Sequence, residues 1–116
     1  MTLLAESIVI EMYERTYVVN LYLTYYPAGG AKALVLHSIE GPFATLSVNI
    51  PEHKLADDEV LVKTWSENER IIEPVLATGL FEDTGRRVPT GYCEAQVWRL
   101  TDAAKAALAE RGHVEN

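Results

Sequence analysis

Residues 15–26 read Arg-Thr-Tyr-Val-Val-Asn-Leu-Tyr-Leu-Thr-Tyr-Tyr. Large apolar and aromatic side chains occupy every second position of this stretch, and a period of two is typical of a β-strand with one buried face. The pattern therefore predicts a strand whose odd-numbered residues point inward. Those residues are Tyr17, Val19, Leu21, Leu23 and Tyr25.

Three further strands are predicted around this one. Residues 7–13 precede it, and residues 33–39 and 43–50 follow it with similar β-branched and apolar composition. The segment 27–30 ends in two glycines, which supply the positive φ angles of a hairpin turn, and residues 40–42 form a second turn. Strands joined by short turns pair antiparallel, so the N-terminal half predicts a four-stranded meander.

A helix is predicted over residues 66–78, after a short strand at 59–65. Ser66 and Glu69 have the spacing of a capping box, in which each side chain binds a free backbone N–H group of the first turn. Pro74 lies beyond that turn and is expected to kink or divide the helix, because it lacks an N–H donor. The apolar residues at helical spacing, which should pack on the sheet, are Ile71, Ile72, Val75 and Leu76.

The remainder of the chain predicts a loop, a strand and a helix. Residues 79–91 contain three glycines and a proline and are expected to be a loop, with Phe81 anchored in the core. Residues 92–100 predict a strand, and residues 103–111 predict an Ala-rich helix that ends before Gly112 and leaves a frayed tail.

These elements define the predicted fold class. The expected architecture is α+β, with an antiparallel sheet of five or six strands, one helix packed on a face and a short C-terminal helix. A length of 116 residues with 48% hydrophobic side chains suits a single domain over residues 1–116. The single Cys93 excludes an internal disulfide, and no signal peptide or membrane span is recognisable, so we expect a cytoplasmic protein.

Acidic residues are concentrated in one part of the chain. The net charge is −7, and residues 51–83 hold nine acids and three bases, which accounts for −6 of it. This balance argues against direct binding of nucleic acid, because the phosphates would be repelled. It favours a solvated acidic face or attraction to a basic partner. The acids are Glu52, Asp57, Asp58, Glu59, Glu67, Glu69, Glu73, Glu82 and Asp83.

No catalytic or metal-binding pattern is recognisable. His37, His53 and His113 have no ligand spacing, and Cys93 has no histidine near it in the sequence to activate it as a nucleophile. The acids lack the alternating oxygen ligands of a calcium loop. We therefore predict no metal, no cofactor, no catalytic residue and no enzyme activity.

Arg86 and Arg87 stand out beside the acidic segment. Two adjacent guanidinium groups could grip a carboxylate or phosphate of a ligand in bidentate fashion. Alternatively, they could pair with Glu82 and Asp83, or with the helix, and hold the loop in place. The sequence leaves both interpretations open.

Two segments resemble a known family. Residues 42–49 read Pro-Phe-Ala-Thr-Leu-Ser-Val-Asn, and Gly79-Leu80 and Thr84-Gly85-Arg86 precede Gly91-Tyr92. This combination resembles a family of small uncharacterised proteins of phages, plasmids and other bacterial mobile elements. Residues 62–68 are similar to the strand-to-helix junction of that family. Thr78 stands where the family has Asn, and the Ala-rich C-terminal helix is additional.

The resemblance implies a function in the conflict between mobile elements and their hosts. We expect a non-enzymatic anti-CRISPR or other anti-defence inhibitor that binds a basic surface of a host protein or ribonucleoprotein complex as a monomer or homodimer. The alternatives are a homodimeric accessory protein without a defence role and a small enzyme acting on an anionic ligand. The candidate partner-binding residues are Asp57, Asp58, Glu59, Glu67, Glu69, Glu82, Asp83, Arg86 and Arg87.

Overall fold

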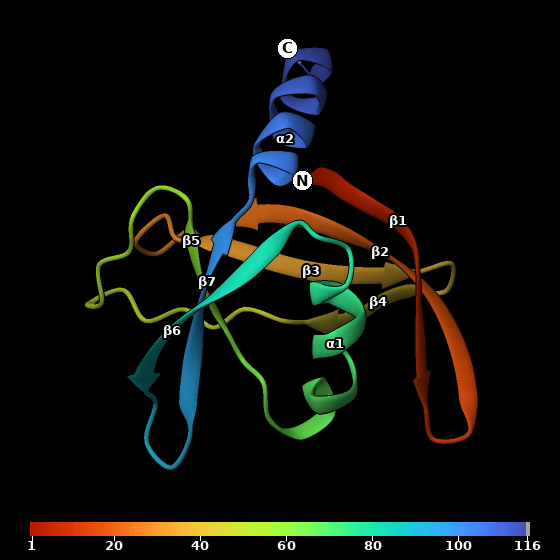
Figure 1. Cartoon of the computed structure of the whole chain (residues 1–116), viewed down its shortest axis with the longest axis horizontal. Coiled ribbons are helices and arrows are strands. Elements are labelled where there is room, and N and C mark those ends of the chain that lie inside the picture. The colour runs from red at the N-terminus through yellow and green to blue at the C-terminus, as the bar shows by residue number, and fades with distance from the viewer. Residues whose placement is uncertain (116) are drawn as a thin grey trace.

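The computed structural model of the chain describes residues 1–115, apart from the side chains of Glu67 and of residues 111–115. Its elements confirm the α+β class and form two antiparallel sheets with a buried core between them (Figure 1). In chain order the elements are β1 (Thr2–Met12), β2 (Arg15–Tyr25), β3 (Lys32–Ser38), β4 (Gly41–Thr45), β5 (Glu59–Val62), the 3₁₀ helix η1 (Ser66–Arg70), α1 (Ile72–Leu76), β6 (Phe81–Pro89), β7 (Glu94–Leu100) and α2 (Asp102–Glu115).

The first sheet is the predicted meander, with strand order β1-β2-β3-β4. Val19, Leu21 and Leu23 are at most 2% exposed, so the inward face of β2 is confirmed along its centre. Tyr25, at the end of the strand, is 58% exposed and departs from the pattern. Two positive-φ glycines, Gly29 and Gly30, close the turn between β2 and β3, as predicted.

The prediction of one sheet with five or six strands was wrong, because the chain leaves the first sheet at Leu46. The backbone N–H of Leu46 donates to the carbonyl of Leu34 in β3, at 2.9 Å, whereas its own carbonyl accepts from the N–H of Lys63 beyond β5, at 2.6 Å. Ser47 then pairs with Val62. The predicted strand 43–50 is therefore divided between two sheets: Ala44 and Thr45 pair with the neighbouring β3, whereas Ser47 pairs with the more distant Val62.

The second sheet has the order β5-β7-β6, and β6 occupies most of the segment that was predicted to be a loop. The Thr84-Gly85 sequence forms a bulge in the strand, with Gly85 at φ +86°. The side chains of Asp83 and Thr84 accept hydrogen bonds from the N–H groups of Gly85 and Arg86, at 2.9 and 3.2 Å. Residues that are typical of turns therefore form a bulge inside β6. The expected turn at Thr90-Gly91 is present and connects β6 to β7.

The predicted helix 66–78 is two short helices. The capping box is absent: Trp65 is the N-cap of η1 and no side chain caps it. Ser66 has φ +62°, which lies outside the helical region. Pro74 falls in the first turn of α1, where the missing N–H is tolerated, so the break before Ile72 agrees with the expected interruption.

Asn68 ties η1 to the crossover between the sheets. This side chain is fully buried, and its Nδ2 donates to the carbonyls of Thr45 and Lys63, at 3.1 and 2.9 Å. Because Thr45 ends β4 and Lys63 follows β5, one amide holds both sheets and the helix together. No local sequence pattern indicated this role for Asn68.

The C-terminal helix begins as predicted and ends later. The Thr101 hydroxyl caps α2 by accepting a hydrogen bond from the N–H of Ala104, at 3.3 Å. The predicted end at Gly112 was wrong, because the helical backbone continues to Glu115. Side chains in the predicted tail 113–116 lie outside the described part.

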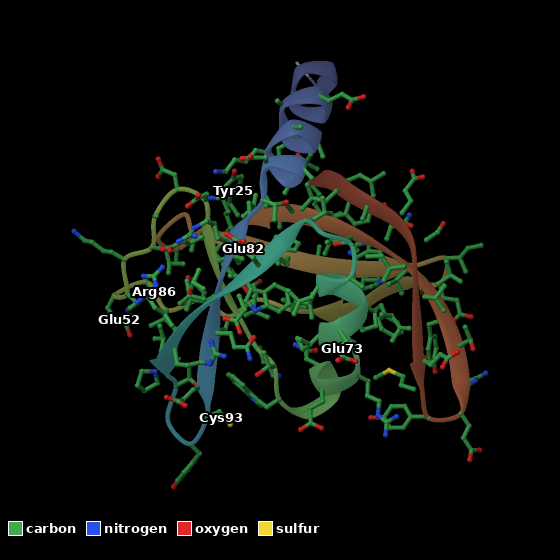
Figure 2. The ribbon with its side chains drawn as sticks, in the orientation of Figure 1. Tyr25, Glu52, Glu73, Glu82, Arg86 and Cys93 are labelled. Carbon is green, nitrogen blue, oxygen red and sulfur yellow. The ribbon has the colours of Figure 1, made fainter. Side chains whose placement is uncertain are left out.

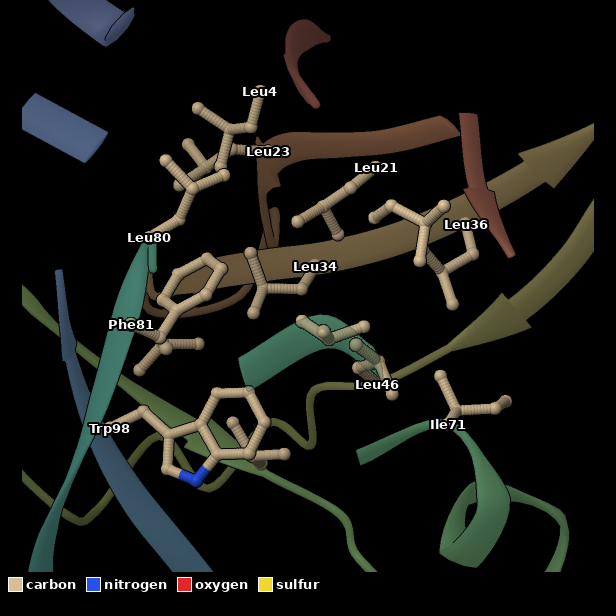
Figure 3. Packing of buried hydrophobic residues seen from close by; sticks show 14 of the residues in the cluster. Leu4, Leu21, Leu23, Leu34, Leu36, Leu46, Ile71, Leu80, Phe81 and Trp98 are labelled. Atoms are coloured by element: carbon tan, nitrogen blue, oxygen red, sulfur yellow. The ribbon is translucent and has the colours of Figure 1, made fainter. Parts of the chain in front are cut away.

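The main core fills the space between the sheets (Figure 3). The Phe81 and Trp98 rings of the second sheet lie 5.7 Å apart and point toward Leu34 of the first. Phe81 is 4% exposed, which confirms that it is anchored in the core. A smaller cluster on the opposite face of the second sheet is covered by residues of segment 48–55; its buried members are Leu61, Val88, Ala95 and Val97.

Candidate functional site

The second sheet brings Arg86 to Glu59. The two residues are 27 positions apart, and their side chains form an ion pair although β7 lies between their strands. Glu59 is 5% exposed, and its carboxylate also accepts the N–H of Ala56, at 2.9 Å. Arg86 therefore supplies the positive charge that a buried carboxylate requires.

Arg87 binds Asp83 within β6. Its guanidinium donates to both carboxylate oxygens, at 2.9 and 3.0 Å, in the bidentate geometry that Arg and carboxylates favour. This interaction lowers the pKa of Asp83 below its ordinary value, and the N–H of Gly85 contributes in the same direction. Of the two interpretations of the arginine pair, the contacts favour the structural one, with Glu59 as an unforeseen partner.

The Asp83 pKa leads to a testable pH dependence. A carboxyl group whose pKa is lowered by folding stabilises the folded state above its ordinary value of 3.8, and that contribution is lost as the pH falls through the folded pKa. We expect the free energy of unfolding to fall less between about pH 6 and pH 3 in Asp83→Asn than in the wild type, by under ~1 kcal/mol for this exposed pair. Urea unfolding at each pH measures it. Identical pH profiles would contradict the assignment.

Three more acids of the candidate set are close to bases. Glu82 pairs with Arg99 at 3.3 Å, and Asp58 pairs with Lys105 at 3.1 Å. The hydrogen bond from Lys105 lowers the pKa of Asp58. The Lys32 ammonium donates to the backbone carbonyl of Asp57, and burial lowers the pKa of that lysine against the opposing effect of both aspartates.

The candidate residues therefore do not form one acidic face. Asp57, Asp58, Glu59, Glu82 and Asp83 lie beside five basic side chains, so this region, which we call the paired band, carries little net charge. Glu69 lies apart from it on η1, and the side chain of Glu67 is outside the described part. Figure 2 shows Arg86 at the left edge of the molecule and Glu73 well apart from it on α1.

A second group of acids surrounds a groove between β1 and the η1–α1 segment. Its volume is about 660 Å³, and its charged lining consists of Glu11, Glu69, Glu73 and Arg70. Three carboxylates against one guanidinium leave the groove with excess negative charge. Val9 and Pro74 complete the lining, and Val9 is 52% exposed. We call this surface the acidic groove.

Glu11 was not among the acids singled out from the sequence, and Glu73 was counted among them but was not a candidate partner-binding residue. Glu11 is 58 residues from Glu69, and it belongs to a segment that is close to neutral on average. Its alternating position in β1, opposite the buried Ile10 and Met12, was the available sign that it faces outward. Nothing local indicated that η1 would lie beside it.

Groups with catalytic potential are dispersed. His37 is on β3 with its ring tilted against that of Tyr22, His53 is in an exposed loop, and Cys93 is in the β6–β7 turn and partly exposed. Within residues 1–115, the described side chains form no cluster of three or more His, Cys, Asp or Glu residues that could hold a metal ion. No helix in that range is long and apolar enough to span a membrane.

Together these features define a small α+β protein with two antiparallel sheets, a charge-neutral paired band and a separate acidic groove. The chain matches no protein-family model, no curated protein and no solved structure. Its function must therefore be argued from its own surface.

Proposed function

We propose that this protein is a non-enzymatic inhibitor that binds a basic surface of another protein through the acidic groove. The single observation that carries the proposal is the excess of carboxylates there: Glu11, Glu69 and Glu73 surround one arginine. Carboxylates on a fixed scaffold can substitute for phosphates against Arg and Lys side chains of a partner. The exposed Val9 adds apolar contact area beside the charges.

The paired band is less suited to this role. Its carboxylates would have to exchange an internal Arg or Lys for an external one, and the gain from such an exchange is small. Glu59 is also buried and out of reach of a partner. Of the candidate residues, Glu69 is retained in the docking surface, while Glu59 and Arg86 are assigned to stability.

The class of partner follows from the resemblance of segments 42–49 and 79–92 to proteins of mobile elements. We propose that the partner is a host complex that processes nucleic acid, such as a CRISPR effector or a restriction enzyme. Such complexes carry a basic groove for their substrate, and an acidic protein that fills it competes with nucleic acid.

The test is charge reversal in the groove. The variant Glu11→Lys/Glu69→Lys/Glu73→Lys is compared with the wild type in bacteria that carry individual CRISPR or restriction systems and are challenged with phage. We expect the wild type to raise plaque numbers against at least one system and the variant to lose at least about tenfold of that effect, since three lost exposed charge contacts of ~0.5 kcal/mol each amount to about tenfold in affinity.

The matched control is Glu52→Lys/Glu94→Lys/Glu110→Lys, which changes the net charge equally at exposed positions outside the groove. It should retain most of the inhibition. Equal loss in both variants would show that net charge alone matters and would refute the groove. If the wild type protected phage from none of the systems, the proposed partner class would be wrong.

A further inference from the structure

The outer face of the first sheet is uncovered in the described part of the chain. The inner face packs on the core, whereas Val9 and Val18, which are cross-strand neighbours, are 52% and 54% exposed on the outer one. Ile39, in the turn between β3 and β4, is fully exposed. Because Val9 and Val18 are cross-strand neighbours, they form a contiguous apolar patch and are not isolated exposed side chains.

A groove of about 970 Å³ runs across this face. Tyr22 and His37 lie in it with their ring centroids 5.3 Å apart, beside Asn20. The Asn20 side chain is already engaged, since its Oδ1 accepts the N–H of Ser7 in the β1 bulge, at 3.0 Å. The centre of the groove is therefore built from the two rings and an amide whose oxygen already has a hydrogen-bond donor.

The groove on the outer face carries no net charge, whereas the protein as a whole is acidic. Only two charged residues line it, Arg15 at the start of β2 and Glu40 in the β3–β4 turn, and their charges cancel. Neither side chain makes an ion pair with another described residue. A chain with a net charge of −7 thus has a broad groove whose lining carries one charge of each sign.

We propose that this face binds a second copy of the chain to form a symmetric homodimer. A two-fold axis parallel to the strands and between β2 and β3 would place Arg15 over the partner's Glu40 and, by symmetry, Glu40 over the partner's Arg15. The same operation brings the Tyr22–His37 pair onto its own copy. An isologous interface requires such self-complementarity, and two sheets packed face to face commonly align their strands in this way.

A second copy suits the face better than a basic partner does. Two copies repel each other through net charge wherever acidic surfaces meet, so association is favourable only where the charge cancels. A basic partner would gain no electrostatic attraction from a neutral groove. Val9 borders both this face and the acidic groove, but Arg15 and Glu40 do not line the acidic groove, so failure of the dimer can be told apart from failure of the proposed function.

Charge exchange tests the inference. We expect analytical ultracentrifugation at micromolar concentration to give the wild type a molecular mass of twice the 12.9 kDa of the chain. Arg15→Glu alone and Glu40→Arg alone should each weaken self-association at least tenfold, because both symmetric contacts become repulsive. When the two variants are mixed, both contacts are attractive again, and a heterodimer should form.

Val18→Asp is a second, independent variant, and it should produce a monomer with an unchanged circular dichroism spectrum. A wild type that remained monomeric at about 100 µM would refute the inference. So would single charge variants that still dimerise, or a mixture of the two that stays monomeric. Retained inhibition by a monomeric variant would leave the proposed function standing.

Discussion

Replacement of Trp98 by Ala is expected to reduce the free energy of unfolding by about 3–5 kcal/mol. Trp98 is fully buried on β7, the central strand of the second sheet, and its ring lies against Phe81. The indole N–H donates to the side-chain oxygen of Gln96, at 2.8 Å, so the polar group of this buried ring has a hydrogen-bond partner. Truncation would leave a cavity between the sheets and remove contacts from both.

Urea unfolding followed by circular dichroism measures this loss. Small domains are stable by only about 5–15 kcal/mol, so Trp98→Ala could leave little folded protein. Trp98→Phe keeps most of the ring volume and should cost less than the Ala variant. Trp65→Ala is the matched control, because Trp65 is only partly buried at the smaller cluster. A loss at Trp98 no larger than at Trp65 would contradict the assigned core.

Arg86→Ala is expected to cost about 2–3 kcal/mol, which is unusually large for a surface arginine. Removing one partner of a fully buried pair costs ~3–5 kcal/mol, because a charge is left uncompensated. Here Glu59 is buried but Arg86 is half exposed, so water offsets part of the loss. In Arg86→Ala the Glu59 carboxylate would keep the hydrogen bond from the Ala56 N–H, which does not compensate its charge.

A double-mutant cycle with Glu59→Gln isolates the interaction. In the double variant no uncompensated carboxylate remains, so it should be more stable than Arg86→Ala alone. Arg99→Ala is the matched control, because Arg99 pairs with the exposed Glu82 and such pairs contribute ~0–1 kcal/mol. Equal effects at Arg86 and Arg99 would show that Glu59 does not depend on its partner.

The fold could be predicted where the pattern is local. The alternation in β2 predicted its buried face, and the glycines at 29–30 predicted the turn that follows. The break before Pro74 also followed from one residue's chemistry. In contrast, β6 was taken for a loop, because Thr84 and Gly85 are typical of turns and equally typical of a bulge.

The candidate site was harder to predict, because ion pairs join residues from different strands. The charge excess in residues 51–83 suggested one acidic face, yet Arg86, Arg99, Lys105 and Lys32 come from outside that segment and neutralise part of it. The acidic groove combines Glu11 with helical residues far along the chain. The net charge of a segment does not show which of its side chains form ion pairs, and only the folded structure shows which acids are free to bind a partner.

Local side-chain periodicity and turn chemistry were enough to establish the meander, the α+β class and the acidic character of the chain. These signals depend on residues that are close together in the sequence, so they can be recognised without knowing the tertiary structure. Three features required the folded chain: the change of sheet at Leu46, the burial of Glu59 beneath Arg86 and the position of η1 beside β1. Each depends on contacts between distant segments, whose energies arise only when the whole core is packed.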